Sequence, residues 1–564
     1  MNNDNLIVAV VLSIAILIGF NYLYEQPRRT ELQHRVLAEK LSKEAKPESK
    51  EALALPKRDR QAIIAESKRV RINTAELSGS INLKGARIDD LSMAGYRENT
   101  EENSKNITLL SPAGSADPEQ PYYAEFGWLG DGAVVPNGST EWKADSTELT
   151  TKKPVHLSWD NGQGLLFEKT ISIDEHFMFT IVDRVKNTGA NTATLYPFGL
   201  IARHGKPSTM DLFILHEGPM GVLNGTVTEY KYKDLVTENR KFTESQGGWI
   251  GVTDKYWLVA LIPPQDEKVA ATFTYESGND PNPDKGLFQS DFRGTPVSLA
   301  SGASTERSAH MFAGAKRVRL LDQYSDQFSI PHFDRAIDFG WFYFLTKPFL
   351  YLLDIMGGWF GNFGLAILLF TVILKVVTLP LSVKSYRSMG RLKDLQPEIK
   401  KIQEKYQEDK MKINVETMEL YKREKVNPMS GCLPNLIQIP IFFALYKVLF
   451  VGIEMRHAPF YGWIRDLSAA DPTSVLTLFG TINWAIIPHL GVWPLLMGIS
   501  MFLQQKMSPQ PPDKSQARVF MLMPIIFTFM LSSVAAGLVI YWTWSNLLGI
   551  GQQWYIMKHS GHKK

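Results

Sequence analysis

Cysteine is almost absent from this chain, whose 564 residues include one, Cys432. A single thiol excludes an internal disulfide and a metal site built from cysteines, and because Cys432 lies in an apolar stretch we expect a small buried side chain. The excess of positive over negative charge is also small, since the formal net charge is +3. A nucleic-acid-binding protein needs a concentrated basic face, so the composition predicts no direct DNA binding.

Two signatures of catalysis are missing as well. No glycine-rich loop ends in Gly-Lys-Ser or Gly-Lys-Thr, so the sequence offers no P-loop for a nucleotide. No carboxylates, histidines or nucleophiles stand in a pattern typical of a catalytic or metal site. We therefore expect no enzyme activity, no metal and no cofactor.

Long apolar runs lie at the N-terminus and after about residue 340. The first covers Leu6 to Tyr24, close to the 20 or so residues that cross a bilayer. Its apolar core is too long for a cleaved signal peptide and no small-x-small cleavage site follows, so residues 1–24 predict a retained anchor. Residues 25–60 are rich in Glu, Lys, Ala and Pro and predict a charged linker.

Residues 61–325 have a different pattern, with short alternating runs such as VHLSW, LLFEKTISI and FMFTIVDRV. Turn signals such as DNG, NTG and SGND separate these runs. The pattern predicts an all-β domain, a large sandwich. Residues 326–360 then mix aromatic and leucine residues with charges too often for a simple span, which indicates an amphipathic helical region lying in the membrane interface.

A membrane bundle with five spans is predicted for residues 361–557. The basic residues Lys384, Arg387, Arg391 and Lys393 follow the first span and should stay in the cytoplasm. The N-terminus and the basic tail, residues 558–564, are then cytoplasmic, and residues 25–360 are periplasmic. Counting Val475–Ile487 as a further span would place a basic loop outside, so we reject it. The predicted spans are at about 365–383, 433–453, 493–505, 519–534 and 537–557.

Between the first two of these spans, residues 384–428 predict a cytoplasmic helical hairpin. Apolar residues recur at steps of three and four along both of its helices, which indicates an antiparallel coiled coil. The first helix carries Leu392, Leu395, Ile399, Ile402 and Tyr406, and the second carries Met411, Val415 and Met418.

Polar side chains inside the predicted spans are the candidate functional residues. Lys375 lies near the middle of the 365–383 span, where a charge costs about 2.5 to 3.5 kcal/mol. That cost indicates a wet cavity lined by protein, although the side chain could instead reach toward the cytoplasmic interface. Thr371 lies one turn earlier on the same face. Gln438, Ser545 and Asn546 add polar groups that lipid cannot satisfy, either as interhelical hydrogen bonds or as part of a shallow polar groove.

The stretch VNPMSGCLPNLIQIPIFFALYKVL, Val426–Leu449, resembles the signature of the YidC/Oxa/Alb insertase family. The match continues through LLMGISMFLQQKMSP and GLVIYWTWSNLLGIGQQ, and the anchor and large β domain resemble the Gram-negative form, whose periplasmic domain is a β-supersandwich. The resemblance implies an insertase and chaperone of the bacterial inner membrane that works alone or with the Sec translocon. It also implies a hydrophilic groove and no nucleotide hydrolysis.

The resemblance assigns roles to particular residues. Lys375 stands where the family usually has arginine, so the charge is kept and the planar fork of donors is lost. Thr371 matches a polar groove position, and Trp542 falls where the family often has tyrosine. The hairpin is implied to dock the ribosome and the signal recognition particle receptor, while the clients are newly made membrane proteins released into the lipid bilayer. Its candidate residues are Lys384, Arg387, Arg391, Lys393, Tyr421 and Lys425.

Two other classes of protein compete with this interpretation. A membrane-anchored carbohydrate enzyme or sugar-binding protein needs clustered polar residues, but Asp160, His176, His204 and His216 are spread along the β domain. A transporter or channel is typically built from inverted repeats of broken helices, and the sequence shows no such repeat.

Overall fold

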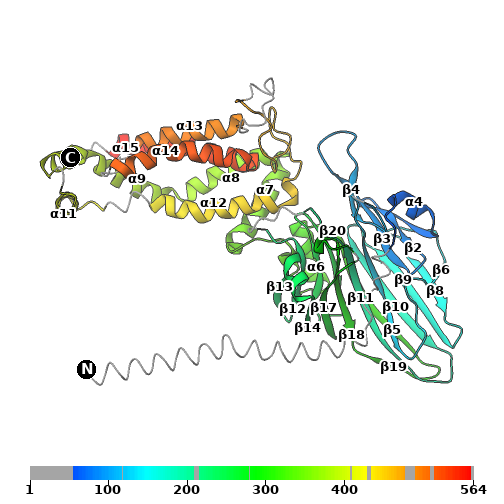
Figure 1. Cartoon of the computed structure of the whole chain (residues 1–564). Coiled ribbons are helices and arrows are strands. Elements are labelled where there is room, and N and C mark those ends of the chain that lie inside the picture. The colour runs from blue at the N-terminus through cyan, green and yellow to red at the C-terminus, as the bar shows by residue number, and fades with distance from the viewer. Residues whose placement is uncertain are drawn as a thin grey trace, which may run out of the picture. The chain divides into compact units, whose positions relative to one another are not determined.

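The computed structural model describes residues 55–116, 118–208, 215–278, 280–406, 409–427, 433–476, 490–508 and 514–560. These residues form two compact units (Figure 1). One is rich in strands and ends at Ala336, and the other is helical and begins at Ile337. The helical unit also takes in the short stretches Asn99–Glu102 and Arg317–Arg319. The predicted N-terminal anchor and Cys432 lie outside the described residues.

The strand-rich unit is built from two sheets in which every pairing of neighbouring strands is antiparallel except that of β1 with β7. The first sheet has the order β14 (Arg240–Gln246), β17 (Lys268–Glu276), β18 (Leu287–Gly294), β11 (Ala193–His204), β5 (Tyr122–Asp131), β3 (Arg87–Arg97), β2 (Leu77–Asn82), β1 (Arg69–Asn73) and β7 (Glu148–Leu149), with β19 (Val297–Leu299) beside β11 and β4 (Asn106–Leu110) beside β3. The second has the order β13 (Thr226–Glu229), β12 (Gly218–Leu223), β15 (Trp249–Thr253), β16 (Trp257–Ile262), β20 (Ser304–Ala315), β10 (Met178–Asn187), β9 (Leu165–Ile173), β8 (Val155–Asp160) and β6 (Lys143–Ala144). Short helices complete the unit, namely α4 (Arg60–Ala65), α5 (Tyr232–Glu238), η2 (Pro283–Lys285), α6 (Val318–Gln327) and η3 (Phe333–Ala336).

The two sheets pack face to face, which confirms the predicted sandwich. The Tyr122 hydroxyl on β5 donates to the Val252 carbonyl on β15, 3.4 Å away in the other sheet. Alternation is regular along β9, where every second residue from Leu165 to Ile173 is buried. One of these core positions is Lys169, whose ammonium group donates to Asp183 Oδ1 at 2.5 Å and to the Phe126 carbonyl at 2.9 Å. The buried charge is therefore paired, as burial of an ion requires.

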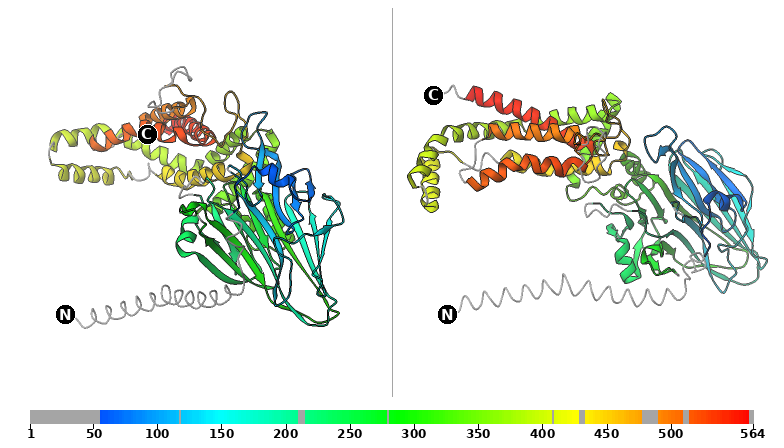
Figure 2. Two further views of the ribbon diagram at one scale, coloured as in Figure 1. Left: turned by 45° about the vertical axis from the view of Figure 1, so that its right-hand side comes forward. Right: turned by 45° about the horizontal axis from the view of Figure 1, so that its top comes forward.

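The helical unit contains a helix at each of the five predicted spans. Helices α12, α13, α14 and α15 run side by side (Figures 1 and 2). A helical C-terminal region is thus confirmed, while the number of membrane crossings stays a prediction. The helices are α7 (Tyr343–Phe360), α8 (Phe363–Val377), α9 (Leu379–Asp394), α10 (Gln396–Tyr406), α11 (Lys410–Arg423), α12 (Leu433–Val451), α13 (Val492–Met507), α14 (Lys514–Met530) and α15 (Ala536–Ser560), with single turns η5 (Ile453–Met455) and η6 (Leu531–Ser533).

The first predicted span of the bundle is bent rather than straight. Helix α8 ends at Val377 and α9 begins at Leu379, with 66° between the two. Pro380 stands in the first turn of α9, where its missing N–H is tolerated and the preceding helix is interrupted. No single described helix is both long and apolar enough to cross a membrane, whereas α8 and α9 meet that criterion together.

Helix α7 has one face packed inside the unit and one face exposed. The Phe349 ring meets Phe370 of α8 with 4.8 Å between centroids. On the other side Trp359 is 73% exposed, and just ahead of the helix Trp341 is 97% exposed. Exposed aromatic side chains on an otherwise apolar helix are typical of a segment at a membrane surface. The interfacial position expected for residues 326–360 stays a prediction.

Helices α10 and α11 lie antiparallel. Arg423 pairs with Glu398 at 3.2 Å near one end, and the Tyr406 hydroxyl donates to Glu416 at 3.1 Å near the other. Residues far apart in sequence therefore meet in reversed order. A helical hairpin is present in this region, while its coiled-coil packing stays a prediction.

The packing expected for the apolar stripe on the second hairpin helix is wrong, while the stripe expected on the first is buried at two of its five residues. Leu392 and Ile399 are buried as expected. On α11 the buried side chains are instead Thr417 and Leu420. Spacing at three and four residues defines a stripe but does not determine which stripe meets a neighbouring helix. The three residues that were expected to pack against the first helix are exposed instead: Met411 by 80%, Val415 by 57% and Met418 by 49%.

A buried carboxylate joins the loop after η5 to the start of α13. Asp471 is 1% exposed. Its Oδ1 accepts from the Trp463 indole at 3.0 Å, the Thr473 amide at 3.0 Å and the Thr473 hydroxyl at 2.7 Å, and its Oδ2 accepts from the Trp493 amide at 2.9 Å. The Trp493 amide belongs to the first turn of α13, where helical N–H groups lack partners. Asp471 therefore acts as the cap of α13.

Candidate functional site

Lys375 lies in the last turn of α8, two residues before the helix ends. The sequence places it near the middle of a span, but the bend at Thr378 puts it at a helix C-terminus, where the helix dipole favours a cation. Its side chain is half-buried. Among the described residues, the ion pairs of the helical unit involve other cations, and none includes Lys375. The structure thus places a positive charge without a paired carboxylate inside the helical unit.

Thr371 lies one turn before Lys375 and is 1% exposed. Its hydroxyl donates to the Ile367 carbonyl at 2.6 Å, the preceding turn of its own helix. This bond satisfies the donor locally. Thr371 therefore faces the interior of the helical unit, and it offers other molecules only the acceptor capacity of its oxygen.

Gln438 on α12 is joined to α15. Its side-chain nitrogen donates to the Tyr541 hydroxyl at 2.5 Å, and Ser545 also hydrogen-bonds Tyr541. Tyr541 is 2% exposed and was not among the residues selected from the sequence. A tyrosine at an apolar helix position carries no signal that distinguishes core packing from a polar contact. Gln438 and Ser545 thus form an interhelical hydrogen-bond network, the alternative left open by the sequence.

Trp542 and Asn546 face different surroundings although both are on α15. The Trp542 ring packs against Phe442 and Phe527, with centroids 4.6 and 5.6 Å away. The Asn546 amide donates to Ser500 Oγ on α13 at 2.9 Å. The predicted groove residues of α12 and α15 therefore separate into an aromatic contact at Trp542, the hydrogen-bond network of Gln438 and Ser545, and the pair of Asn546 with Ser500. None of the hydrogen bonds among the described residues connects them to Lys375.

Four basic residues predicted for the cytoplasmic hairpin are exposed on α9, and three of them, Lys384, Arg387 and Arg391, share one side of the helix at steps of three and four residues. Lys384, Arg387, Arg391 and Lys393 are all exposed, whereas Tyr386 and Met389 on the other side pack against Ile556 of α15. The helix is anchored by its apolar side and presents an unpaired basic surface, which we call the α9 basic face. Tyr421 is half-buried near the end of α11, and the exposed Lys425 follows in a left-handed conformation that closes the helix.

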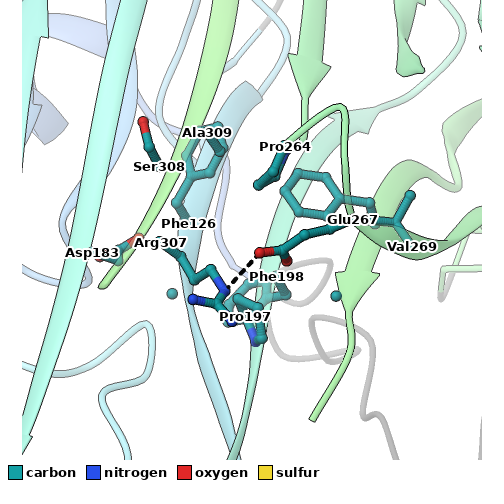
Figure 3. Close-up of a pocket in the computed structure, with 13 residues that line it drawn as sticks. Phe126, Asp183, Pro197, Phe198, Pro264, Glu267, Val269, Arg307, Ser308 and Ala309 are labelled. Carbon is teal, nitrogen blue, oxygen red and sulfur yellow. Dashed lines mark ion pairs between the residues drawn. The ribbon is translucent and has the colours of Figure 1, made fainter. Parts of the chain in front are cut away.

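A pocket in the strand-rich unit tests the carbohydrate interpretation (Figure 3). Phe126 and Phe198 line it together with Arg307, which pairs with Glu267 at 3.0 Å. Aromatic and charged side chains would suit a sugar. The cavity volume of about 20 Å³ is, however, close to the space of one water molecule. A sugar ring does not fit, and the three charged residues of the lining already have partners, Arg307 with Glu267 and Asp183 with Lys169.

The four polar residues considered for a carbohydrate site are not brought together. His176 approaches Glu76 at 3.5 Å, and His204 approaches the Tyr123 hydroxyl at 3.5 Å. His216 contacts the Pro219 carbonyl, and Asp160 accepts from the Gly162 amide. Each has a different partner. No group of three or more His, Cys, Asp or Glu residues that could hold a metal occurs in the described ranges.

Comparison with known proteins covers both units. The family described as 60Kd inner membrane protein matches residues 355–563, and the YidC periplasmic domain matches residues 69–352. Membrane protein insertase YidC from Methylobacterium nodulans is 50% identical over 100% of this chain and 96% of that protein. The protein of the same name from Methylorubrum extorquens is 46% identical with the same coverage. A solved active YidC insertase is 17% identical with a TM-score of 0.36, covering 89% of this chain and 96% of that one.

These matches define an inner membrane protein with a periplasmic domain. The chain belongs to the YidC family of membrane protein insertases. The family resemblance seen in the signature Val426–Leu449 is thereby confirmed.

Proposed function

We propose that this chain inserts newly made proteins into the inner membrane and helps them fold and assemble, without hydrolysing a nucleotide and without catalysing a reaction. The unpaired cation at Lys375 carries the proposal. Carrying a client's polar segment across about 30 Å of hydrocarbon is prohibitive. A hydrated groove that reaches Lys375 would shorten that dry path, and its charge would draw in an acidic segment.

Release of the client follows from the same physics. Once the polar segment has crossed, the apolar segment lowers its free energy by moving sideways from the groove into lipid. No further energy source is needed for that step. The proposed groove is lined by Lys375 and Thr371 of α8, Gln438 of α12, and Trp542, Ser545 and Asn546 of α15.

The orientation we propose places the α9 basic face in the cytoplasm and residues 25–360 in the periplasm. Both chain termini are then cytoplasmic. A cluster of exposed Lys and Arg beside a membrane helix favours this orientation. The exposed aromatic face of α7 would lie at the periplasmic surface of the membrane.

The α9 basic face and the hairpin that follows it are the proposed docking region. Family resemblance suggests the ribosome and the signal recognition particle receptor as partners there, and the Sec translocon beside the bundle. Phosphate-rich RNA and acidic proteins are attracted by exposed Lys and Arg, so the four basic residues of α9 support such contacts.

Reconstitution tests the proposed function. The purified full-length protein would be placed in liposomes, and a small membrane protein with a short periplasmic tail would be synthesised outside them. We expect the tail to become protected from added protease without ATP, and to stay unprotected in empty liposomes. Absence of protection even for ribosome-bound clients would contradict an insertase that acts alone.

A further inference from the structure

Positive charge without balancing acid is concentrated on helix α9. Its 16 residues include four basic side chains and one carboxylate, Asp394, at the C-terminal end. The next two helices of the hairpin mix both signs and carry two glutamates each. Among the described residues, no ion pair or hydrogen bond involves the side chains of Lys384, Arg387 or Arg391. We call these three, which share one side of the helix, the basic stripe.

Exposed apolar side chains come directly before the basic stripe. Val376 and Val377 at the end of α8 are 61 and 70% exposed, and Leu379 at the start of α9 is 37% exposed. Such side chains favour hydrocarbon over water. An exposed apolar surface is therefore followed within about two turns by an exposed basic one. That order is typical of a segment that passes from the hydrocarbon core of a membrane into its phosphate layer.

The bend between α8 and α9 keeps the whole stripe near one depth. Lys384 and Arg391 are separated by about 10 Å along the helix axis. With α8 along the membrane normal, the 66° bend makes that length rise only about 4 Å away from the hydrocarbon core. The headgroup layer on one side of a bilayer is about 5 to 7 Å thick. A straight continuation of α8 would carry Arg391 beyond that layer, whereas the bent helix holds all three charges within it.

We propose that the basic stripe binds anionic phospholipid headgroups of the cytoplasmic leaflet and so holds the start of the hairpin against the membrane. Each Lys or Arg beside a negatively charged leaflet strengthens binding about fivefold, so three contribute about a hundredfold. Lys393 lies on the other side of α9, the side on which Tyr386 and Met389 pack against α15. It is left for partners in the cytoplasm. Lipid binding goes beyond the proposed insertion and rests only on its orientation.

The test uses the full-length protein, without a client, in nanodiscs of phosphatidylcholine alone or of phosphatidylcholine mixed with phosphatidylglycerol. Amide hydrogen exchange of α9 is followed by mass spectrometry. We expect wild-type α9 to exchange at least about tenfold more slowly in the anionic discs. A triple variant should exchange alike in both, namely Lys384→Gln with Arg387→Gln and Arg391→Gln. The matched control removes three exposed lysines of α10 and should keep the difference, namely Lys400→Gln with Lys401→Gln and Lys405→Gln.

Equal exchange of wild-type α9 in the two kinds of disc would overturn the proposal. An equal loss of the difference in the α10 control would also overturn it, because diffuse attraction of the hairpin to the surface needs no stripe. Slower exchange that appears with added ribosomes and not with phosphatidylglycerol would assign the stripe to RNA. In wild type, which requires no variant to fold, about 1 M salt should remove the difference, since it screens charges beyond about 3 Å; a difference that persists contradicts binding through charge. Because no client is present, this outcome is independent of the insertion assay.

Discussion

Replacing Asp471 by alanine should strongly destabilise the helical unit. The carboxylate is 1% exposed and accepts four hydrogen bonds, from the Trp463 indole, the Thr473 amide and hydroxyl, and the Trp493 amide. Its removal leaves buried donors without partners and uncaps α13. With a net value of about 1 kcal/mol for each of the four bonds, the bond to the Trp493 amide being the cap itself, we expect a loss of about 3 to 5 kcal/mol.

The assay is unfolding of the full-length protein in detergent micelles by added sodium dodecyl sulfate, followed by tryptophan fluorescence. Trp463 and Trp493, two of the 13 tryptophans of the chain, contact the carboxylate through the indole N–H and the backbone amide, so their emission forms part of the unfolding signal. Asp471→Asn keeps an acceptor and loses the charge, so it should fall between wild type and Asp471→Ala. The control is Asp394→Ala at the exposed end of α9. A loss below about 0.5 kcal/mol for Asp471→Ala, equal to that of the control, would refute the capping role.

Three further predictions concern charges elsewhere. Burial, with a smaller contribution from Arg87, lowers the pKa of His204 to about 4. Because an unfolded histidine titrates near 6.5, the protein should lose stability as the pH falls from about 6.5 to 4, by about 2 kcal/mol at pH 5. At pH 5, hydrogen exchange of β11 should therefore be faster in wild type than in His204→Gln. Lys169→Met should cost about 3 to 5 kcal/mol, seen in the same exchange experiment, because it leaves Asp183 buried without its cation; an unchanged exchange rate would contradict that pairing. Glu398→Gln should change stability by less than about 0.5 kcal/mol in detergent unfolding, since its pair with Arg423 is exposed, and a larger loss would mean that the hairpin depends on this bond.

The strand-rich unit could be predicted from sequence because local patterns determine it. Runs such as LLFEKTISI alternate at period two, and the structure places that run on β9 with alternate residues buried. The buried Lys169 breaks the pattern, since its acceptors come from β10 and β5, which only tertiary structure brings near. The sequence likewise predicts helices at the spans, but not the 66° bend after Val377.

The candidate site was less predictable, because it depends on contacts between helices that only tertiary structure brings together. A lysine within an apolar run is visible in the sequence, so Lys375 could be selected. Tyr541 carries no such signal, and its hydrogen bond to Gln438 depends on how α12 and α15 pack. The exposed stripe on α11 shows the same limit, because Met418 has the spacing of a packed residue and yet is 49% exposed.

Insertion by liposomes that contain only this protein, measured for wild type and for Lys375 variants, tests the central claim most directly. The client carries either an acidic or a neutral periplasmic tail. The account predicts that Lys375→Arg preserves insertion of both, and that Lys375→Glu slows the acidic client at least about tenfold while the neutral client still inserts. Equal rates for the two clients in every variant would contradict a groove that works through the charge of Lys375.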